Sequence, residues 1–328
     1  MPTDRPKIGI ALSGASGRAI AHIGVLEVLK ENNIPVDVVV GCSSGALIAV
    51  SYATDTMEEL KQYLRKLTIG KLLSLWSSKD ARGGLFHLHN ATEELEKFTK
   101  GKKLEDVYPR IGFVAADINT GELVTLTQGD MIEAFKATVA VPGLLEPAVM
   151  GNKVLVDGGL VNIVPTKAAR DMGADLVIGV NIAATKFIYE KRLPIWRGYR
   201  FLTKILGLQF IRDKILTKLA SRILFQFDSQ SDFLEEDMVK MPGTIGVLVR
   251  ALDRSMEISD QWEESEISCD LMLEPRVKHF GKVDFAKMEK IYLEGRRAAE
   301  AALPEIRRLI GNFGKGKVGQ PATKLKLS

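Results

Sequence analysis

Short apolar runs alternate with longer amphipathic segments from the start of the chain as far as Ile182. Small or apolar residues fill Ile8–Leu12, and every residue of Val36–Val40 except Asp37 is a valine, which predicts two buried strands. Between them, apolar residues recur at helical spacing in Ala19–Asn32. Four later runs have the character of further strands: Ile111–Ala116, Leu123–Thr127, Lys153–Val156 and Leu176–Ile182. Continuous apolar strands separated by helices are typical of a mostly parallel sheet covered on both faces, so the pattern predicts an α/β fold.

The sequence changes character in residues 185–224, where ten lysines and arginines stand against two acidic residues. This segment carries a formal charge of +8, so the remainder of the chain sums to −4 within a net charge of +4. Apolar residues recur at helical spacing among the basic ones, which predicts a basic amphipathic helical insertion over about residues 185–245. Such a face suits an anionic membrane surface, although it would equally suit a protein partner or packing on the domain.

The end of the chain predicts a closing helix followed by a polar tail. Residues Ile291–Ile310 follow a helical pattern, in which Pro304 predicts a break or a restart. Residues 311–328 are rich in glycine and lysine, and we expect them to be disordered. We therefore expect a single domain over residues 7–310, with the insertion as its cap.

Composition narrows the class of protein. Hydrophobic residues make up 46% and charged residues 26%, as in soluble globular proteins. The two cysteines, Cys42 and Cys269, are too few for a disulfide scaffold, and no Cys/His cluster has the spacing of a zinc site. No apolar run reaches the ~18 residues of a membrane span. We expect a cytoplasmic protein, at most peripheral on the inner membrane surface, that binds neither metal nor nucleic acid; the sequence does not indicate its oligomeric state.

Candidate chemistry first appears where the second predicted strand meets a small-residue helix, at Gly41-Cys42-Ser43-Ser44-Gly45. A serine on a sharp strand-to-helix turn between two glycines is the arrangement of a nucleophile elbow. The helix that follows would offer free N–H groups and a positive dipole end to a developing oxyanion. An ordinary glycine-rich connection between a strand and a helix would have the same sequence pattern. The motif therefore indicates a catalytic serine only if further catalytic motifs occur elsewhere in the chain.

Two partner motifs are present. Strand Ile8–Leu12 runs into a small-residue loop, Ser13–Arg18, whose backbone N–H groups could form an anion-binding nest. A nucleotide site is the competing interpretation, but neither the dinucleotide fingerprint nor the phosphate-loop Gly-Lys-Ser/Thr is present. Downstream, Asp157-Gly158-Gly159 ends a predicted strand, where the aspartate could be either a turn residue or a catalytic base.

Together and in this order, the motifs resemble those of the patatin-like phospholipases. The resemblance covers roughly residues 7–183 and 269–303. It rests on the loop at Gly14–Arg18, the Ala-His-Ile-Gly-Val-Leu stretch at Ala21–Leu26, the elbow at Gly41–Gly45, the segment Ala116–Glu122, Val141–Gly143, Asp157–Gly159 and the closing segment from Asp284. The resemblance implies a three-layer α/β/α fold with a mostly parallel central sheet.

It also implies a serine–aspartate dyad and not a triad. Ser43 would attack the carbonyl of a lipid or other acyl ester, and Asp157 would take its proton. An acyl-enzyme would form on Ser43, and water would then release the fatty acid. The resemblance calls for no cofactor and no metal.

In the same comparison, the loop Gly14–Arg18 would form the oxyanion and substrate-binding site. Backbone N–H groups around Gly14, Ala15 and Ser16, with Gly17 alongside, would hold the oxyanion, while Arg18 would either fix the loop or meet a negative head group. The family usually has consecutive glycines where this chain has Ala15 and Ser16. A Cβ at a position of positive φ costs about 1 kcal/mol or more, so weak turnover is one expectation.

Two alternatives therefore stay open. The first is a weakly active or non-catalytic lipid- or protein-binding module on the same fold. The second is a conventional triad hydrolase, since Ser43, Asp157 and His279 occur in the required chain order. His279 stands in a polar stretch without a clear strand–loop signal, so we interpret it as a structural or exposed residue.

Overall fold

The computed structural model describes residues 5–76, 84–86, 88–183, 269–281, 284–313 and 323–325. The strands are β1 (Ile8–Leu12), β2 (Val38–Cys42), β3 (Gly84–Phe86), β4 (Arg110–Asp117), β5 (Leu123–Leu126), β6 (Gly143–Leu145), β7 (Ala148–Met150), β8 (Lys153–Asp157), β9 (Leu176–Val180), β10 (Leu271–Leu273) and β11 (Thr323–Leu325). The helices are α1 (Ile20–Glu31), α2 (Ser44–Ala53), α3 (Met57–Arg65), α4 (Ile69–Ser74), α5 (Thr92–Thr99), α6 (Met131–Thr138), α7 (Thr166–Asp171) and α11 (Met288–Gly311).

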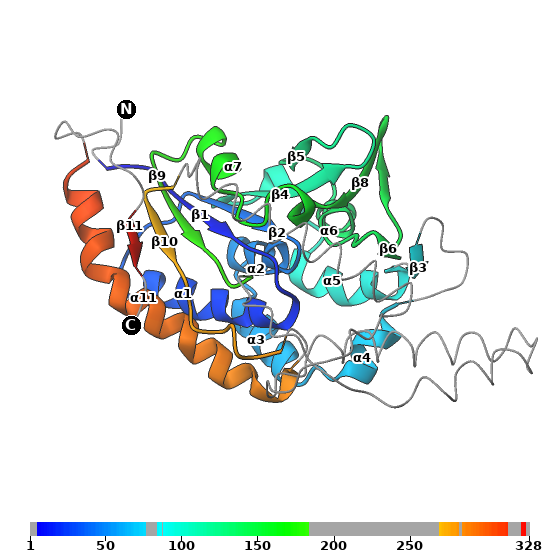
Figure 1. The fold of residues 1–328 in the computed structure, drawn as a ribbon, viewed down its shortest axis with the longest axis horizontal. Coiled ribbons are helices and arrows are strands. Elements are labelled where there is room, and N and C mark those ends of the chain that lie inside the picture. The colour runs from blue at the N-terminus through cyan, green and yellow to red at the C-terminus, as the bar shows by residue number, and fades with distance from the viewer. Residues whose placement is uncertain are drawn as a thin grey trace, which may run out of the picture.

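A nine-stranded sheet with the order β11-β10-β9-β1-β2-β4-β8-β7 forms the core, and β5 pairs with β4 as well (Figure 1). Its centre is parallel, since β1 pairs in parallel with both β2 and β9, and β2 with β4. On one side β8 runs antiparallel to β4, and β7, which is antiparallel to β8, again has the direction of the central strands. The sheet is thus mostly parallel, as the sequence predicts.

Helices cover both faces of this sheet. Every residue of β1, β2 and β9 is buried. Ile10 and Val39 pack in the large cluster that contains α1 and α11, whereas Ala11 and Val40 pack with Ala168 of α7 on the opposite face. Figure 1 shows α1 and α11 side by side below the sheet and α7 above it. The predicted three-layer α/β/α fold is confirmed.

The structure differs from the sequence prediction at one strand and at one helix. Strand β2 begins at Val38 and ends at Cys42, two residues later than predicted, because its pairing with β4 continues to the Cys42–Val114 register pair. The predicted break at Pro304 is wrong: α11 continues through this proline to Gly311. A proline removes one N–H and crowds the preceding turn, but here α11 packs along α1, and this tertiary packing offsets the local cost.

Two predictions concern residues that the structure leaves undescribed. The helical insertion over about 185–245 lies outside the described residues. In the tail, α11 reaches Gly311 and β11 pairs with β10, while the other residues beyond 313 also lie outside them. Among the helices that are described, none is both long and apolar enough to cross a membrane.

Candidate active site

Ser43 sits where β2 turns directly into α2. Its backbone has φ 52° and ψ −125°, a strained conformation for a residue with a side chain. The flanking glycines make the turn possible: a Cβ at Gly41 would lie 2.4 Å from Ala46 N, and one at Gly45 would lie 2.5 Å from Leu12 O. The spacing of the two glycines around Ser43 is thus a steric requirement of this strand–turn–helix connection, as in a nucleophile elbow.

A buried threonine supports the turn from the neighbouring helix. The N–H of Ser43 donates to Thr138 Oγ1 at 2.9 Å, and the Thr138 hydroxyl donates to Val114 O at 2.6 Å. Thr138 ends α6 and is fully buried. We did not predict this residue from the sequence; the available signal was a lone hydroxyl in the otherwise small and apolar run from Ala137 to Val141.

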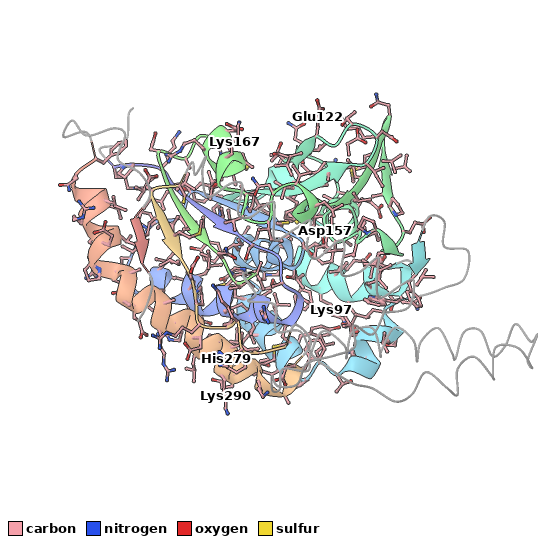
Figure 2. The ribbon with its side chains drawn as sticks, in the orientation of Figure 1. Lys97, Glu122, Asp157, Lys167, His279 and Lys290 are labelled. Carbon is pink, nitrogen blue, oxygen red and sulfur yellow. The ribbon has the colours of Figure 1, made fainter. Side chains whose placement is uncertain are left out.

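The reversed direction of β8 carries Asp157 to the elbow. Asp157 ends β8 and pairs with Ala115 of β4, next to the position where Val114 pairs with Cys42 at the end of β2. Its side chain is buried, and Oδ1 accepts hydrogen bonds from Gly159 N at 2.9 Å and from Cys42 Sγ at 3.8 Å. The structure therefore brings Asp157 into contact with the residue that immediately precedes Ser43. Figure 2 shows Asp157 near the centre of the molecule.

The loop after β1 lies against Ser43. A Cβ at Gly14 would be 2.7 Å from Ser43 Cβ, so only glycine fits there. Ala15 is extended, with φ −178°, and its N–H donates to Ser44 Oγ at 3.1 Å. Ser16 has φ 52°, the left-handed conformation that favours glycine. No described residue accepts a hydrogen bond from the N–H of Gly14, Ser16 or Gly17.

Buried side chains fix this loop from behind. Nε2 of His22 donates to Ser13 O at 2.9 Å, and burial lowers the pKa of His22 to about 4, so the ring is neutral at pH 7. The Ser13 hydroxyl accepts the N–H of Ile182 at 2.9 Å. The Arg18 guanidinium is buried and donates to the carbonyls of Phe280, at 2.8 Å from Nε, and Lys278, at 3.1 Å. Of the two roles expected for Arg18, its contacts support fixing the loop.

His279 is placed elsewhere. It is exposed on the segment between β10 and α11, with its ring centroid 4.0 Å from that of Phe280. In Figure 2 it lies beside α11, well separated from Asp157. Over the described ranges, no group of three or more His, Cys, Asp and Glu side chains could hold a metal ion.

Comparison with known proteins places this site in a family context. The sequence model of the patatin-like phospholipases matches residues 10–170, a span that includes the loop, the elbow and Asp157. An uncharacterized NTE family protein of Mycobacterium tuberculosis is 28% identical over 305 residues, which is 90% of this chain and 46% of that protein. A lysophospholipase of Coccidioides immitis is 24% identical over 311 residues, 92% of this chain and 18% of its own length.

The chain thus spans about half or less of the length of these curated relatives. Among solved structures, VipD from Legionella pneumophila aligns with a TM-score of 0.35 at 13% identity, over 95% of this chain and 77% of that one. That similarity is too low to bear on function.

Proposed function

The chain belongs to the patatin-like phospholipase family, and from this premise we propose that it hydrolyses lipid acyl esters with Ser43 as nucleophile and Asp157 as base. The observation that carries the proposal is the conformation of Ser43, a strained residue between the last residue of a buried strand and the first residue of a helix. Active sites are where such strain is commonly found, because it presents a side chain that a relaxed turn would not. The lysophospholipase relative supports a lipid substrate.

The proposed reaction has two acyl transfers. In the first, Ser43 Oγ attacks the ester carbonyl and its proton passes to Asp157, which then gives that proton to the departing alcohol as the ester C–O bond breaks. In the second, water attacks the acyl-enzyme, gives a proton to Asp157, and the carboxylic acid leaves as Ser43 recovers its own. The N–H of Ser44, at the start of α2, and the uncommitted N–H groups of Gly14 and Ser16 would stabilise the oxyanion.

Hydrolysis of a p-nitrophenyl ester series by the wild type, Ser43→Ala and Asp157→Asn tests this proposal. We expect both variants to lose on the order of a thousandfold or more in kcat/KM, and the wild type to prefer longer acyl chains. A fluorophosphonate probe should label the wild type at Ser43 and label Asp157→Asn more slowly. If the wild type hydrolyses the esters no faster than Ser43→Ala does, the proposal that this protein is a serine hydrolase is excluded.

One observation favours a second candidate, a weakly active or non-catalytic lipid-binding module. The N–H of Ala15, one of the expected oxyanion donors, is already bonded to Ser44 Oγ. Loss of a single oxyanion donor can cost roughly a hundredfold in rate. For this module, the wild type and Ser43→Ala would bind phospholipid vesicles equally well, and both would show little or no turnover.

We also propose that residues 185–224 bring the protein to anionic membranes, because they carry a formal charge of +8 among apolar residues. Co-sedimentation with anionic vesicles should weaken at high salt and on Arg197→Glu/Arg200→Glu/Lys204→Glu. The same charge change in α11 (Lys290→Glu/Arg297→Glu/Arg308→Glu) serves as the control. Equal binding by both triple variants would contradict the proposed location.

A further inference from the structure

The backbone N–H of Ser43 has an unusual hydrogen-bond partner. Within β2 the chain pairs with β4 as far as Cys42 and Val114. At Ser43 the chain turns away from β4, with φ 52° and ψ −125°. The N–H of Ser43 therefore no longer takes part in the hydrogen-bond ladder between the strands. Buried N–H groups need an acceptor. The hydroxyl of Thr138 provides one at 2.9 Å, from a residue 95 positions away in the sequence.

The orientation of that hydroxyl is fully determined. A threonine hydroxyl has a single hydrogen to donate, and Thr138 donates it to Val114 O at 2.6 Å. A lone pair is then directed to the N–H of Ser43. Thr138 is fully buried, so water does not compete for either contact. The side chain thereby spans the gap between β2 and β4 that the turn at Ser43 opens.

The same carbonyl also lies beneath the segment that carries the proposed base. A Cβ at Gly158 would be 2.4 Å from Val114 O, so the residue after Asp157 rests on the peptide group that Thr138 holds. One contiguous set of contacts therefore joins Ser43, the Thr138 hydroxyl, Val114 O and Gly158. A shift at Thr138 would be felt both at the nucleophile and beside Asp157.

We propose that Thr138 is a positioning residue, which holds Ser43 in its strained conformation and sets its place relative to Asp157. The inference rests on the proposed function, but Thr138 itself touches no substrate. A displacement of a nucleophile by ~1 Å can cost about a hundredfold in rate, so one well-placed hydroxyl is sufficient to matter.

Two substitutions separate the hydroxyl from the packing. Thr138→Val keeps the shape and removes both hydrogen bonds, whereas Thr138→Ser keeps the hydroxyl and removes the methyl group. We expect Thr138→Val to slow fluorophosphonate labelling of Ser43, and kcat for p-nitrophenyl esters, by roughly 10- to 100-fold, with KM changed little. Thr138→Ser should stay within a few-fold of the wild type.

Thr54 offers a matched control at the far end of α2. It is buried, and its hydroxyl can donate its one hydrogen to either Phe98 O, at 2.7 Å, or Val50 O, at 2.9 Å. Thr54→Val should destabilise the fold as Thr138→Val does, yet leave the labelling rate unchanged. A merely structural Thr138 would behave in the same way, and that result would overturn the proposal. Equal slowing by Thr138→Ser and Thr138→Val would also overturn it, because the methyl group would then be responsible.

Amide hydrogen exchange at Ser43 provides a readout that does not depend on activity. The Ser43 N–H should be protected in the wild type and in Thr138→Ser, and should exchange faster in Thr138→Val. If the wild type neither labels nor hydrolyses esters, the proposed function fails while this measurement still tests the hydrogen bond. Unchanged exchange in Thr138→Val would show that Thr138 does not hold the Ser43 backbone.

Discussion

At the scale of single residues, the loop over Ser43 contains two neighbours with different backbone demands. Ala15 is extended and carries its Cβ without strain, whereas Ser16 has φ 52°, where a Cβ costs about 1 kcal/mol. We therefore expect Ser16→Gly to raise the free energy of unfolding by up to ~1 kcal/mol. Ala15→Gly should lower it by about 0.5–1 kcal/mol, because it only adds freedom to the unfolded chain.

Urea denaturation of these two variants against the wild type checks both signs. The loop sequence alone did not show whether Ala15 or Ser16 would need a positive φ. Both residues stand where the family usually has glycine, so a strained backbone was expected at either one. Destabilisation of equal size by both glycines would mean that Ser16 is not held in the left-handed conformation in solution.

His22 predicts a dependence of stability on pH. Its pKa is lowered to about 4 by burial, against 6.5 for the unfolded chain, so between these values the unfolded state binds a proton that the folded state does not. Stability should therefore fall as the pH is lowered through this window. From pH 7.5 to pH 5 the loss from this residue is about 2 kcal/mol.

Denaturation at these two pH values measures the effect. His22→Gln should remove most of the dependence, and His279→Gln is the matched control because that side chain is exposed. A wild-type stability that does not change from pH 7.5 to pH 5 would contradict a neutral, buried His22. Since His22 bonds to Ser13 O behind the loop, its protonation would also disturb the loop over Ser43.

At the scale of elements, α1 and α11 pack closely at Gly295. A Cβ there would lie 1.9 Å from Ala21 O, a backbone atom that cannot move without moving α1. Gly295→Ala should therefore destabilise the protein by about 1–3 kcal/mol, although alanine favours a helix. Gly311→Ala, at the open end of the same helix, is the control and should be neutral or stabilising. Thermal unfolding of both variants tests this prediction. Equal melting temperatures for Gly295→Ala and Gly311→Ala would rule out the close contact between α1 and α11 at Gly295.

Elements were predicted from the sequence where their signals are local. Apolar runs and the two glycines around Ser43 are enough to predict β1, β2, β4 and the strand–turn–helix order, because each depends on neighbouring residues. Pro304 misled the prediction, since packing on α1 outweighs its local preference. Thr138 and the acceptors of Arg18 could not be predicted from the sequence, because their contacts are not local. Thr138 is 95 residues from Ser43, and Phe280 is 262 residues from Arg18.

At the scale of the whole molecule, the family match ends at residue 170, but the fold continues beyond it. Strand β10 extends the sheet beside β9, and α11 covers α1. Phe280 and Lys278 receive the buried guanidinium of Arg18. The C-terminal segment therefore completes the support of a loop whose own sequence lies at the other end of the chain.

Residues 269–313 therefore act on the loop as a second, separately folded subunit would, although they belong to the same chain. A chain cleaved between residues 184 and 268 would keep Ser43 and Asp157 on one fragment and the acceptors of Arg18 on the other. Neither piece would be sufficient for the proposed activity. The first holds every atom proposed to react, and the second holds the acceptors that keep the loop over Ser43 in place. Activity in a mixture of the two fragments would then follow their association, as it does in a heterodimer.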